Sequence, residues 1–180
     1  MNILAISGSL RAASANTRVV EALPRLAEPG VVVSVYRGLG GLPLFNPDLE
    51  DPLPAPVAEL RRAVGAADAL VICSPEYAHG VAGAMKNALD WLVPSLEFPG
   101  IRAALINAAP HAHHAVEHLR ETLQVMSARL VDEACVTVPM PGRVEDPAAI
   151  AAAPDLAEPL RIALRHLAAA GPRTDLPASP

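Results

Sequence analysis

A polar loop close to the start of the chain carries side chains that could hold a phosphate. The residues SGSLRAASANTR follow a short apolar run and precede a helical pattern. With one glycine and no lysine, the loop matches neither the Rossmann nor the Walker A pattern. It offers three serine hydroxyls, the amide of Asn16 and the guanidinium of Arg11 beside the free N–H groups of a helix start. We therefore interpret the loop as a site for one phosphate monoester. The alternative is a helix cap with a solvated arginine.

A histidine-rich segment, PHAHH at 110–114, follows a later apolar run. His114 and His118 are four residues apart, so they share one helix face and could bind Zn²⁺. The sequence forms no HExxH pattern and offers no evident third ligand. We therefore expect no metal site and keep two other interpretations. The histidines are solvated at a helix start, or His111 or His113 contacts a ligand.

Apolar runs alternate with helical patterns along the chain, as in sheets whose parallel strands are connected by helices. The expected strands are 2–7, 31–37, 69–74, 102–109 and 132–139. The expected helices are 17–28, 57–68, 82–93, 114–130 and 147–170. Asn16 is a suitable N-cap for the first helix, and Pro154 breaks the last. The pattern predicts an α/β fold with three α/β/α layers. Its doubly wound, five-stranded parallel sheet has the flavodoxin-like order 2-1-3-4-5.

This strand order has a consequence for the polar segments. Ligands of such sheets bind at the carboxyl ends of the strands where the winding reverses, here the first and third strands. The phosphate loop follows the first strand, SPEYAHG follows the third, and NAAPHAHH ends the fourth. We therefore expect all three segments to meet at one edge of the sheet and to form one site.

Length and composition limit the class of protein. The chain has 180 residues, is 52% hydrophobic and carries a formal net charge of −5. We expect a single domain over 1–172 and a flexible tail over 173–180. The negative charge argues against nucleic acid or an anionic membrane as a partner. No signal peptide or membrane-spanning run is evident, and Cys73 and Cys135 lie in apolar runs, so we expect unpaired, buried thiols in a cytoplasmic protein.

Three motifs, in the same order, resemble those of the NAD(P)H-dependent FMN reductase family, which includes flavodoxin-like quinone, azo-dye and chromate reductases. GSLRAASANTRVVEAL is similar to the family's phosphate loop, GSLRxxSxN. GLPLFNPDLED is similar to LPLYNxDLE, and SPEYAHGVAGAMKNALDWL is similar to PEYNxSxPGxLKNAIDW. The resemblance extends from Asn2 to about Val138.

The resemblance implies a set of cofactor-binding residues. The family's phosphate contacts correspond to Ser9, Arg11, Ser14, Asn16 and Thr17. Its flavin-ring contacts, made largely by backbone, correspond to Pro75, Glu76, Tyr77, Ala78, His79 and Gly80. The chain departs from the family pattern at two places. Ala78 replaces the usual Asn, and Pro110 and His111 stand where the family has a glycine-rich turn near the flavin, so we expect these two residues to bind the cofactor as well.

The resemblance also implies a function, which is FMN-dependent oxidoreduction. In this interpretation NAD(P)H gives a hydride to FMN, and the electrons pass to a small acceptor such as a quinone, an azo dye or free flavin by a ping-pong mechanism. No side chain is expected to be catalytic, because the chemistry belongs to the cofactor. A homodimer or tetramer is expected. The alternatives are a flavodoxin-like electron carrier, disfavoured by Arg11 and the scarcity of aromatic residues, and a flavin-binding regulator without turnover.

The sequence favours structural roles for several residues near the motifs. Lys86 and Asp90 are spaced to form a surface ion pair on a helix. Trp91 belongs either to the core or to a subunit interface. Glu76 is expected to be a hydrogen-bonding residue of the turn and not a catalytic acid. Leu44 and Phe45, in the long segment rich in glycine and proline, are expected to be packed.

Overall fold

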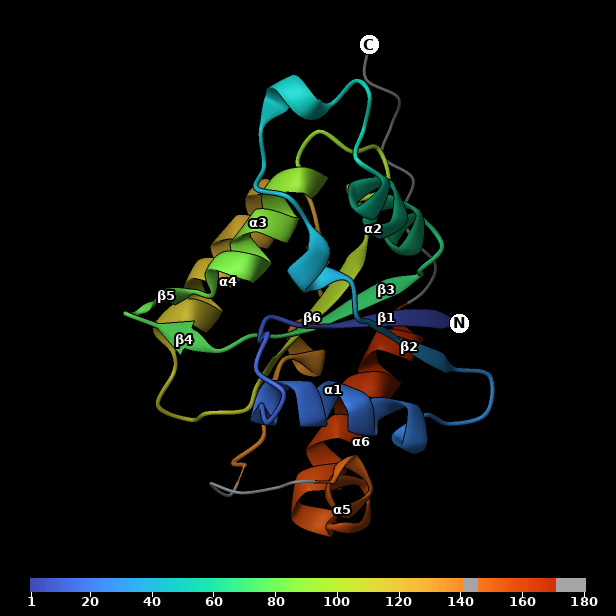
Figure 1. Cartoon of the computed structure of the whole chain (residues 1–180). Coiled ribbons are helices and arrows are strands. Elements are labelled where there is room, and N and C mark those ends of the chain that lie inside the picture. The colour runs from blue at the N-terminus through green and yellow to red at the C-terminus, as the bar shows by residue number, and fades with distance from the viewer. Residues whose placement is uncertain (141–145, 171–180) are drawn as a thin grey trace.

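The structure, a computed structural model, describes residues 1–140 and 146–170 of the chain. A parallel sheet lies between two layers of helices (Figure 1). The main strands are β1 (Asn2–Ser7), β2 (Val32–Tyr36), β3 (Ala69–Cys73) and β6 (Arg102–Asn107). Together with β7 (Arg129–Leu130) they follow the order β2-β1-β3-β6-β7, which confirms the predicted topology. The tail expected over 173–180 lies outside the described residues.

The fifth strand differs from its prediction. It was expected to run over 132–139, but two short strands share this edge of the sheet. β7 pairs with the beginning of β6, and β8 (Val136–Thr137) pairs with its end. Between them lies the 3₁₀ helix η3 (Asp132–Ala134), in which Asp132 pairs with Arg120. Acidic residues are poor strand formers, and here Asp132 and Glu133 are exposed in a turn.

Six α-helices cover the sheet in the described part of the chain. They are α1 (Ala15–Leu26), α2 (Ala55–Gly65), α3 (Gly83–Leu92), α4 (His114–Val125), α5 (Pro147–Ala152) and α6 (Pro154–Ala169). The expected break at Pro154 is present. Two other helix boundaries were wrong. Ser14, not Asn16, occupies the N-cap position of α1. α4 ends at Val125 and not at 130, because Ser127 has a φ of 64° and the chain then turns into β7.

The two faces of the sheet pack into two separate cores. Alternate residues of β1 point in opposite directions, so Ile3 faces one core and Leu4 the other. The first core is covered by α1, α5 and α6, and the second by α2, α3 and α4 (Figure 1). β3 is buried over its whole length, as its uninterrupted apolar sequence predicts. Trp91 of α3 lies fully inside the second core, which settles its place within this chain.

Side-chain hydrogen bonds fix the long segment between β2 and α2 against the helices. This segment contains η1 (Leu39–Gly41) and η2 (Pro47–Leu49). Asn87 and Trp91 of α3 both donate to the carbonyl of Pro43, and Asn87 also accepts from the N–H of Phe45. The Phe45 ring meets Trp91 edge-on at 5.0 Å between ring centroids. Phe45 is therefore packed as predicted, whereas the prediction for Leu44 was wrong, because its side chain is 82% exposed.

The remaining expectations concern cysteines and membranes. Cys73 and Cys135 are both free, with Cys73 buried and Cys135 half-buried. The Lys86–Asp90 ion pair is present at the surface, with 2.6 Å between Nζ and Oδ1. Within the described ranges, no helix combines the length and apolarity needed to cross a membrane.

Candidate functional site

The three polar segments meet at one edge of the sheet, as predicted. β1, β3 and β6 are neighbours, and each is followed by one of these segments. The N–H of Gly8 donates to the carbonyl of Cys73 at 2.9 Å, which joins the phosphate loop to the end of β3. A Cβ atom at Gly8 would lie 2.2 Å from Oγ of Ser74. Glycine is therefore required at this position, because the two segments approach too closely for any side chain.

Hydroxyl groups hold the loop in its shape. Oγ of Ser7 lies 2.9 Å from Oγ1 of Thr17 and accepts from the N–H of Ser9 at 3.2 Å. Oγ of Ser9 accepts from the N–H of Arg11 at 3.3 Å. Ser7 is one of the three loop serines and is not among the expected cofactor contacts. Its place is at the base of the loop, between β1 and α1.

The first turn of α1 presents unpaired N–H groups at this loop. Ser14 occupies the N-cap position, yet its buried side chain makes no capping hydrogen bond. The first N–H bonded within the helix is that of Arg18, which donates to the Ser14 carbonyl. Among the residues described, the N–H groups of Ala15, Asn16 and Thr17 have no partner, and the first turn contains no acidic side chain. The helix start is therefore a positive end that is open to an anion.

The side-chain amide of Asn16 is bonded to the end of β3. Its Oδ1 accepts a hydrogen bond from the thiol of Cys73 at 3.2 Å. Burial raises the pKa of the Cys73 thiol to about 12, so the thiol is protonated and can donate this bond. The bond uses the acceptor side of the amide, so Asn16 offers a phosphate its backbone N–H and no side-chain oxygen is left to repel the anion.

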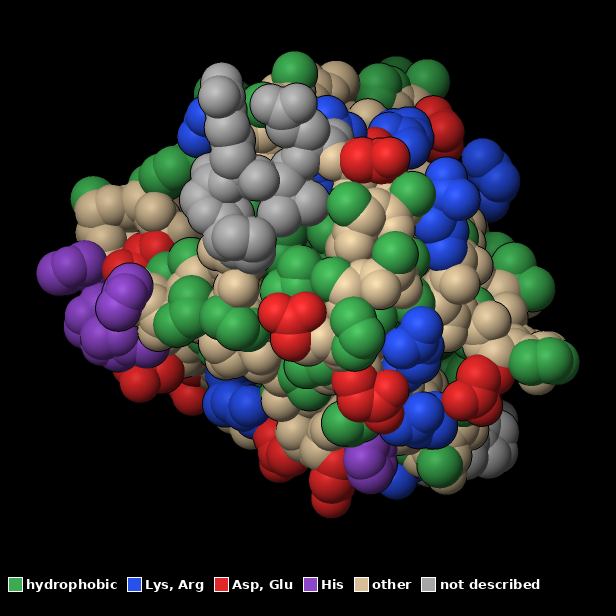
Figure 2. Space-filling view, turned by 90° about the horizontal axis from the view of Figure 1, so that it is seen from below, with side chains coloured by type: hydrophobic (Ala, Val, Ile, Leu, Met, Phe, Trp, Pro, Cys, Tyr) green, Lys and Arg blue, Asp and Glu red, His purple; other side chains and the backbone are tan. Residues whose placement is uncertain are grey.

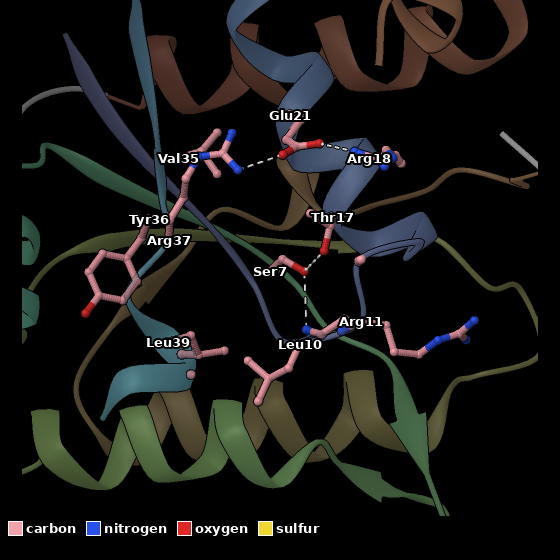
Figure 3. Close-up of a pocket in the computed structure, with 13 residues that line it drawn as sticks. Ser7, Leu10, Arg11, Thr17, Arg18, Glu21, Val35, Tyr36, Arg37 and Leu39 are labelled. Atoms are coloured by element: carbon pink, nitrogen blue, oxygen red, sulfur yellow. Dashed lines mark hydrogen bonds and ion pairs between the residues drawn. The ribbon is translucent and has the colours of Figure 1, made fainter. Parts of the chain in front are cut away.

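Arg11 is exposed, and its guanidinium forms no hydrogen bond or ion pair with any described residue. Figure 3 shows its side chain extending away from the Ser7–Thr17 pair. A long, unpaired arginine can reorient toward an anion at the helix start without breaking an existing contact.

The segment after β3 forms a tight hairpin. β4 (Glu76–Tyr77) and β5 (Gly80–Val81) are antiparallel, and the two residues between them have left-handed backbones. Ala78 has a φ of 49° and His79 a φ of 59°. Tyr77 is 54% exposed, so its ring is available to a ligand. Pro75 leads into the hairpin, as expected for a proline-initiated turn.

Glu76 attaches the hairpin to the start of α4. Its Oε2 accepts from the N–H of Ala115 at 2.9 Å. This bond is the main reason why the pKa of Glu76 is lowered, and the neighbouring imidazoles of His114, His79 and His113 add to the effect. The interaction supports the prediction that Glu76 is a structural hydrogen-bonding residue.

The imidazoles stack on one another beside this hairpin. The ring of His114 lies 4.4 Å from that of His79 and 4.1 Å from that of His113, measured between centroids. Figure 2 shows most of the histidines gathered in one patch of the surface. Within the described part of the chain, no group of three or more His, Cys, Asp or Glu side chains is arranged to hold a metal ion.

Asn107 shapes the turn after β6, a role that was not predicted. Its Oδ1 accepts from the N–H of Ala109 at 2.9 Å, and its Nδ2 donates to the carbonyl of Ala112 at 3.3 Å. Pro110 and His111 are exposed at the tip of this turn. An Asn at a strand end that precedes a polar turn was the available signal, because Asn side chains commonly bond to the backbone two residues on.

A cavity of about 380 Å³ opens on the β2 side of the phosphate loop. It is lined by residues of the loop, of α1, of the end of β2 and of η1. Glu21 of α1 lies between two arginines there. Arg18 reaches one carboxylate oxygen at 2.9 Å and Arg37 reaches the other at 2.8 Å (Figure 3). Sequence spacing does not indicate this cluster, because Arg37 lies at the end of β2 and not on α1.

Comparisons with known proteins agree with the motif resemblance. The family model for NADPH-dependent FMN reductases matches residues 1–141. An NAD(P)H-dependent FMN reductase of Pseudomonas aeruginosa is 36% identical over 129 residues, which cover 68% of this chain and 69% of that protein. The quinone reductase of Escherichia coli K12 is 36% identical over 94 residues, and the match covers 51% of this chain and 50% of that protein.

A solved structure supports the fold. The flavoenzyme NAD(P)H:(acceptor) oxidoreductase FerB of Paracoccus denitrificans superimposes with a TM-score of 0.72 at 24% identity. The alignment covers 93% of this chain and 97% of that one. At this identity the likeness concerns the fold alone.

Proposed function

This chain belongs to the NADPH-dependent FMN reductase family, and we propose that it is an FMN-dependent oxidoreductase that takes a hydride from NAD(P)H and reduces a small acceptor. Quinones, azo dyes and free flavin are the acceptor classes that we would test. Bound FMN would supply the redox chemistry by a ping-pong cycle, in which NAD(P)H and the acceptor use the same place in turn. The chain's own residues bind and orient the cofactor.

The observation that carries this proposal is the open start of α1. Its three unpaired N–H groups, the hydroxyls of Ser9 and Thr17, and the free guanidinium of Arg11 form a donor set suited to one phosphate monoester. The donor set contains no acidic side chain, which would repel the phosphate. A single phosphate corresponds to FMN, whereas the pyrophosphate of FAD would leave one group outside this set.

The hairpin β4–β5 is positioned to hold the flavin ring. It follows β3, whose end is in contact with the phosphate loop through Gly8, so one ligand could reach both. Backbone groups of the left-handed turn do not depend on the side chain at Ala78, so the loss of the family's Asn need not prevent ring binding. Tyr77 adds an exposed aromatic face.

We propose no catalytic acid or base for this site. Glu76 is committed to the N–H of Ala115, and hydride transfer requires no protein acid or base. We also propose a homodimer or tetramer, and a cytoplasmic location in keeping with two free thiols.

The test is an anaerobic titration of the FMN-loaded protein with NADPH and with NADH, followed by a panel of acceptors. We expect a yellow protein that bleaches with a nicotinamide donor and recovers its colour on addition of the acceptor. A colourless protein that ignores added FMN would refute the proposal. A protein that binds FMN but is not reduced would be the electron carrier or the regulator instead.

The substitution Arg11→Ala tests the phosphate site directly. A charge-assisted hydrogen bond contributes roughly 1.5–3 kcal/mol, so FMN affinity should fall about ten- to a hundredfold. The guanidinium forms no hydrogen bond or ion pair with a described residue, and the backbone bond to Ser9 does not depend on the side chain, so the fold should be unaffected. Fluorescence titration of FMN measures the dissociation constant, and an unchanged value would mean that Arg11 stays in solvent.

A further inference from the structure

Most of the lining of the cavity beside the phosphate loop lies outside the FMN site as assigned above. It lies on the β2 side of α1, whereas the hairpin that would hold the flavin ring follows β3 on the other side of β1. The cavity shares Ser9, Arg11 and Thr17 with the loop. It therefore borders the proposed phosphate position and extends away from the proposed ring position.

The lining of the cavity is basic. Arg11, Arg18 and Arg37 contribute three positive charges, and Glu21 contributes the single negative charge. Glu21 offsets one of these charges and the FMN site proposed above uses Arg11, so one positive charge of the Arg18–Arg37 pair remains that no carboxylate of the lining neutralises. In a protein with a net charge of −5, a concentration of arginines in one cavity indicates an anionic ligand.

Arg18 and Arg37 keep N–H groups that do not bond to Glu21. Each arginine bonds to the carboxylate through Nη1. The Arg37 side chain is 70% exposed, and Nε of Arg18 is buried without a partner among the described residues. Burial opposes ionisation of Glu21, but the bonds from Arg37 and Arg18 outweigh it and lower its pKa. Glu21 therefore stays ionised and holds one guanidinium group at each of its two carboxylate oxygens.

The cavity also has apolar walls. Leu10, Val35 and Leu39 line it, and Leu10 is 63% exposed. At about 380 Å³ the volume is larger than one phosphate needs and falls within the range of small-molecule sites. Apolar walls next to arginines suit a ligand with a flat, weakly polar part and a phosphate, such as a phosphorylated adenosine.

We propose that the pocket between Arg18, Arg37 and the phosphate loop binds the phosphorylated adenosine portion of a dinucleotide. This inference rests on the proposed function, since NADPH carries such a group as an adenosine 2′-phosphate. FAD carries one as the AMP half next to its flavin phosphate. In both cases the adenosine would pack against Leu10 and Leu39, and its phosphate would bind to the free donors of Arg18 and Arg37.

The direct test is calorimetric titration of 2′,5′-ADP into protein saturated with FMN. We expect binding that does not displace FMN. Arg37→Ala should weaken this binding by about tenfold, because it removes a charge-assisted contact. Glu21→Gln should strengthen it, because the competing carboxylate charge is removed. Arg25→Ala is the matched control, since Arg25 is an exposed arginine of α1 outside the cavity, and it should have no effect.

Two further measurements identify the source of the adenosine. If the pocket serves the donor, Arg37→Ala will raise the KM for NADPH and leave the KM for NADH unchanged. If it serves the cofactor, the same variant will weaken FAD binding and leave FMN binding unchanged. The proposal is overturned if 2′,5′-ADP does not bind, if it competes with FMN, or if Arg37→Ala acts no differently from Arg25→Ala. If FMN itself does not bind, the proposed function fails. Titration of the apoprotein with 2′,5′-ADP then still shows whether the pocket between Arg18 and Arg37 binds a phosphorylated adenosine.

Discussion

The backbone conformation of the β4–β5 turn predicts how Ala78→Asn changes the stability of the protein. Ala78 and His79 both have left-handed backbones, as in the two-residue turns that normally contain Asn and Gly. A left-handed backbone costs an ordinary L-residue roughly 1–2 kcal/mol. Asn tolerates this conformation much better than Ala, because its short side chain can bond to the local backbone. If Asn relieves about half of this cost, Ala78→Asn should raise the free energy of unfolding by about 1 kcal/mol.

The assay is reversible unfolding by heat and by urea. For a chain of this size, about 1 kcal/mol corresponds to a rise in Tm of roughly 2–4 °C. Ala66→Asn is the control, because Ala66 is exposed and has an ordinary φ of −81° at the end of α2. There the same substitution should give no gain, since no strain is relieved.

Two results would refute the reasoning about backbone strain. A Tm of Ala78→Asn at or below that of the unchanged protein would mean that the left-handed backbone at Ala78 does not lower the stability of the folded protein. An equal gain for Ala66→Asn would mean that Asn stabilises by some route other than the left-handed backbone. The cost of Ala78 also explains why the departure from the family's Asn is tolerated, because it is small compared with a typical stability of 5–15 kcal/mol.

The remaining predictions concern buried groups. Arg102 is 3% exposed and donates to the carbonyls of Asp68 and Leu167, so Arg102→Ala should reduce stability in urea by about 2–4 kcal/mol; a loss below about 1 kcal/mol would contradict this. The arginine contacts lower the pKa of Glu21 in the folded protein despite its burial. Their stabilisation is therefore complete above pH 4.5, the ordinary pKa of the carboxyl, and is lost as the pH falls through the lowered pKa of the folded state. Arg37→Ala should therefore flatten the decline of stability with pH below 4.5, and equal slopes would argue against the pairing. The Cys73 thiol, with its pKa raised to about 12 by burial, should resist alkylation in the native protein while half-buried Cys135 reacts, as peptide mass spectrometry would show; equal rates would contradict the buried thiol.

Most of the sheet could be predicted from the sequence. The apolar runs at β1, β3 and β6 carry their own signal, because a strand buried on both faces contains few polar residues. The fifth strand could not be predicted correctly. Its sequence is short and mixed, and the ion pair of Asp132 with Arg120 contributes to the 3₁₀ turn that interrupts it.

The site was predicted as segments more accurately than as side chains. The phosphate loop, the turn after β3 and the turn after β6 meet as the strand order requires. Individual side chains differ from expectation. Asn16 does not cap α1, and its amide bonds to Cys73, a residue on a strand far away along the chain. A local pattern contains no information on which distant group a polar side chain will meet.

The sequence by itself therefore determined the parallel α/β sheet, the edge at which its loops gather and the family resemblance. These depend on the periodicity of buried residues and on local motifs, both of which are visible along the chain. Only the tertiary structure decided that Arg18, Glu21 and Arg37 face one cavity, that His79 stacks on His114, and that Ala78 holds a left-handed turn. The physical reason is that each of these depends on how separate elements pack against one another, and packing brings together residues that no spacing rule connects.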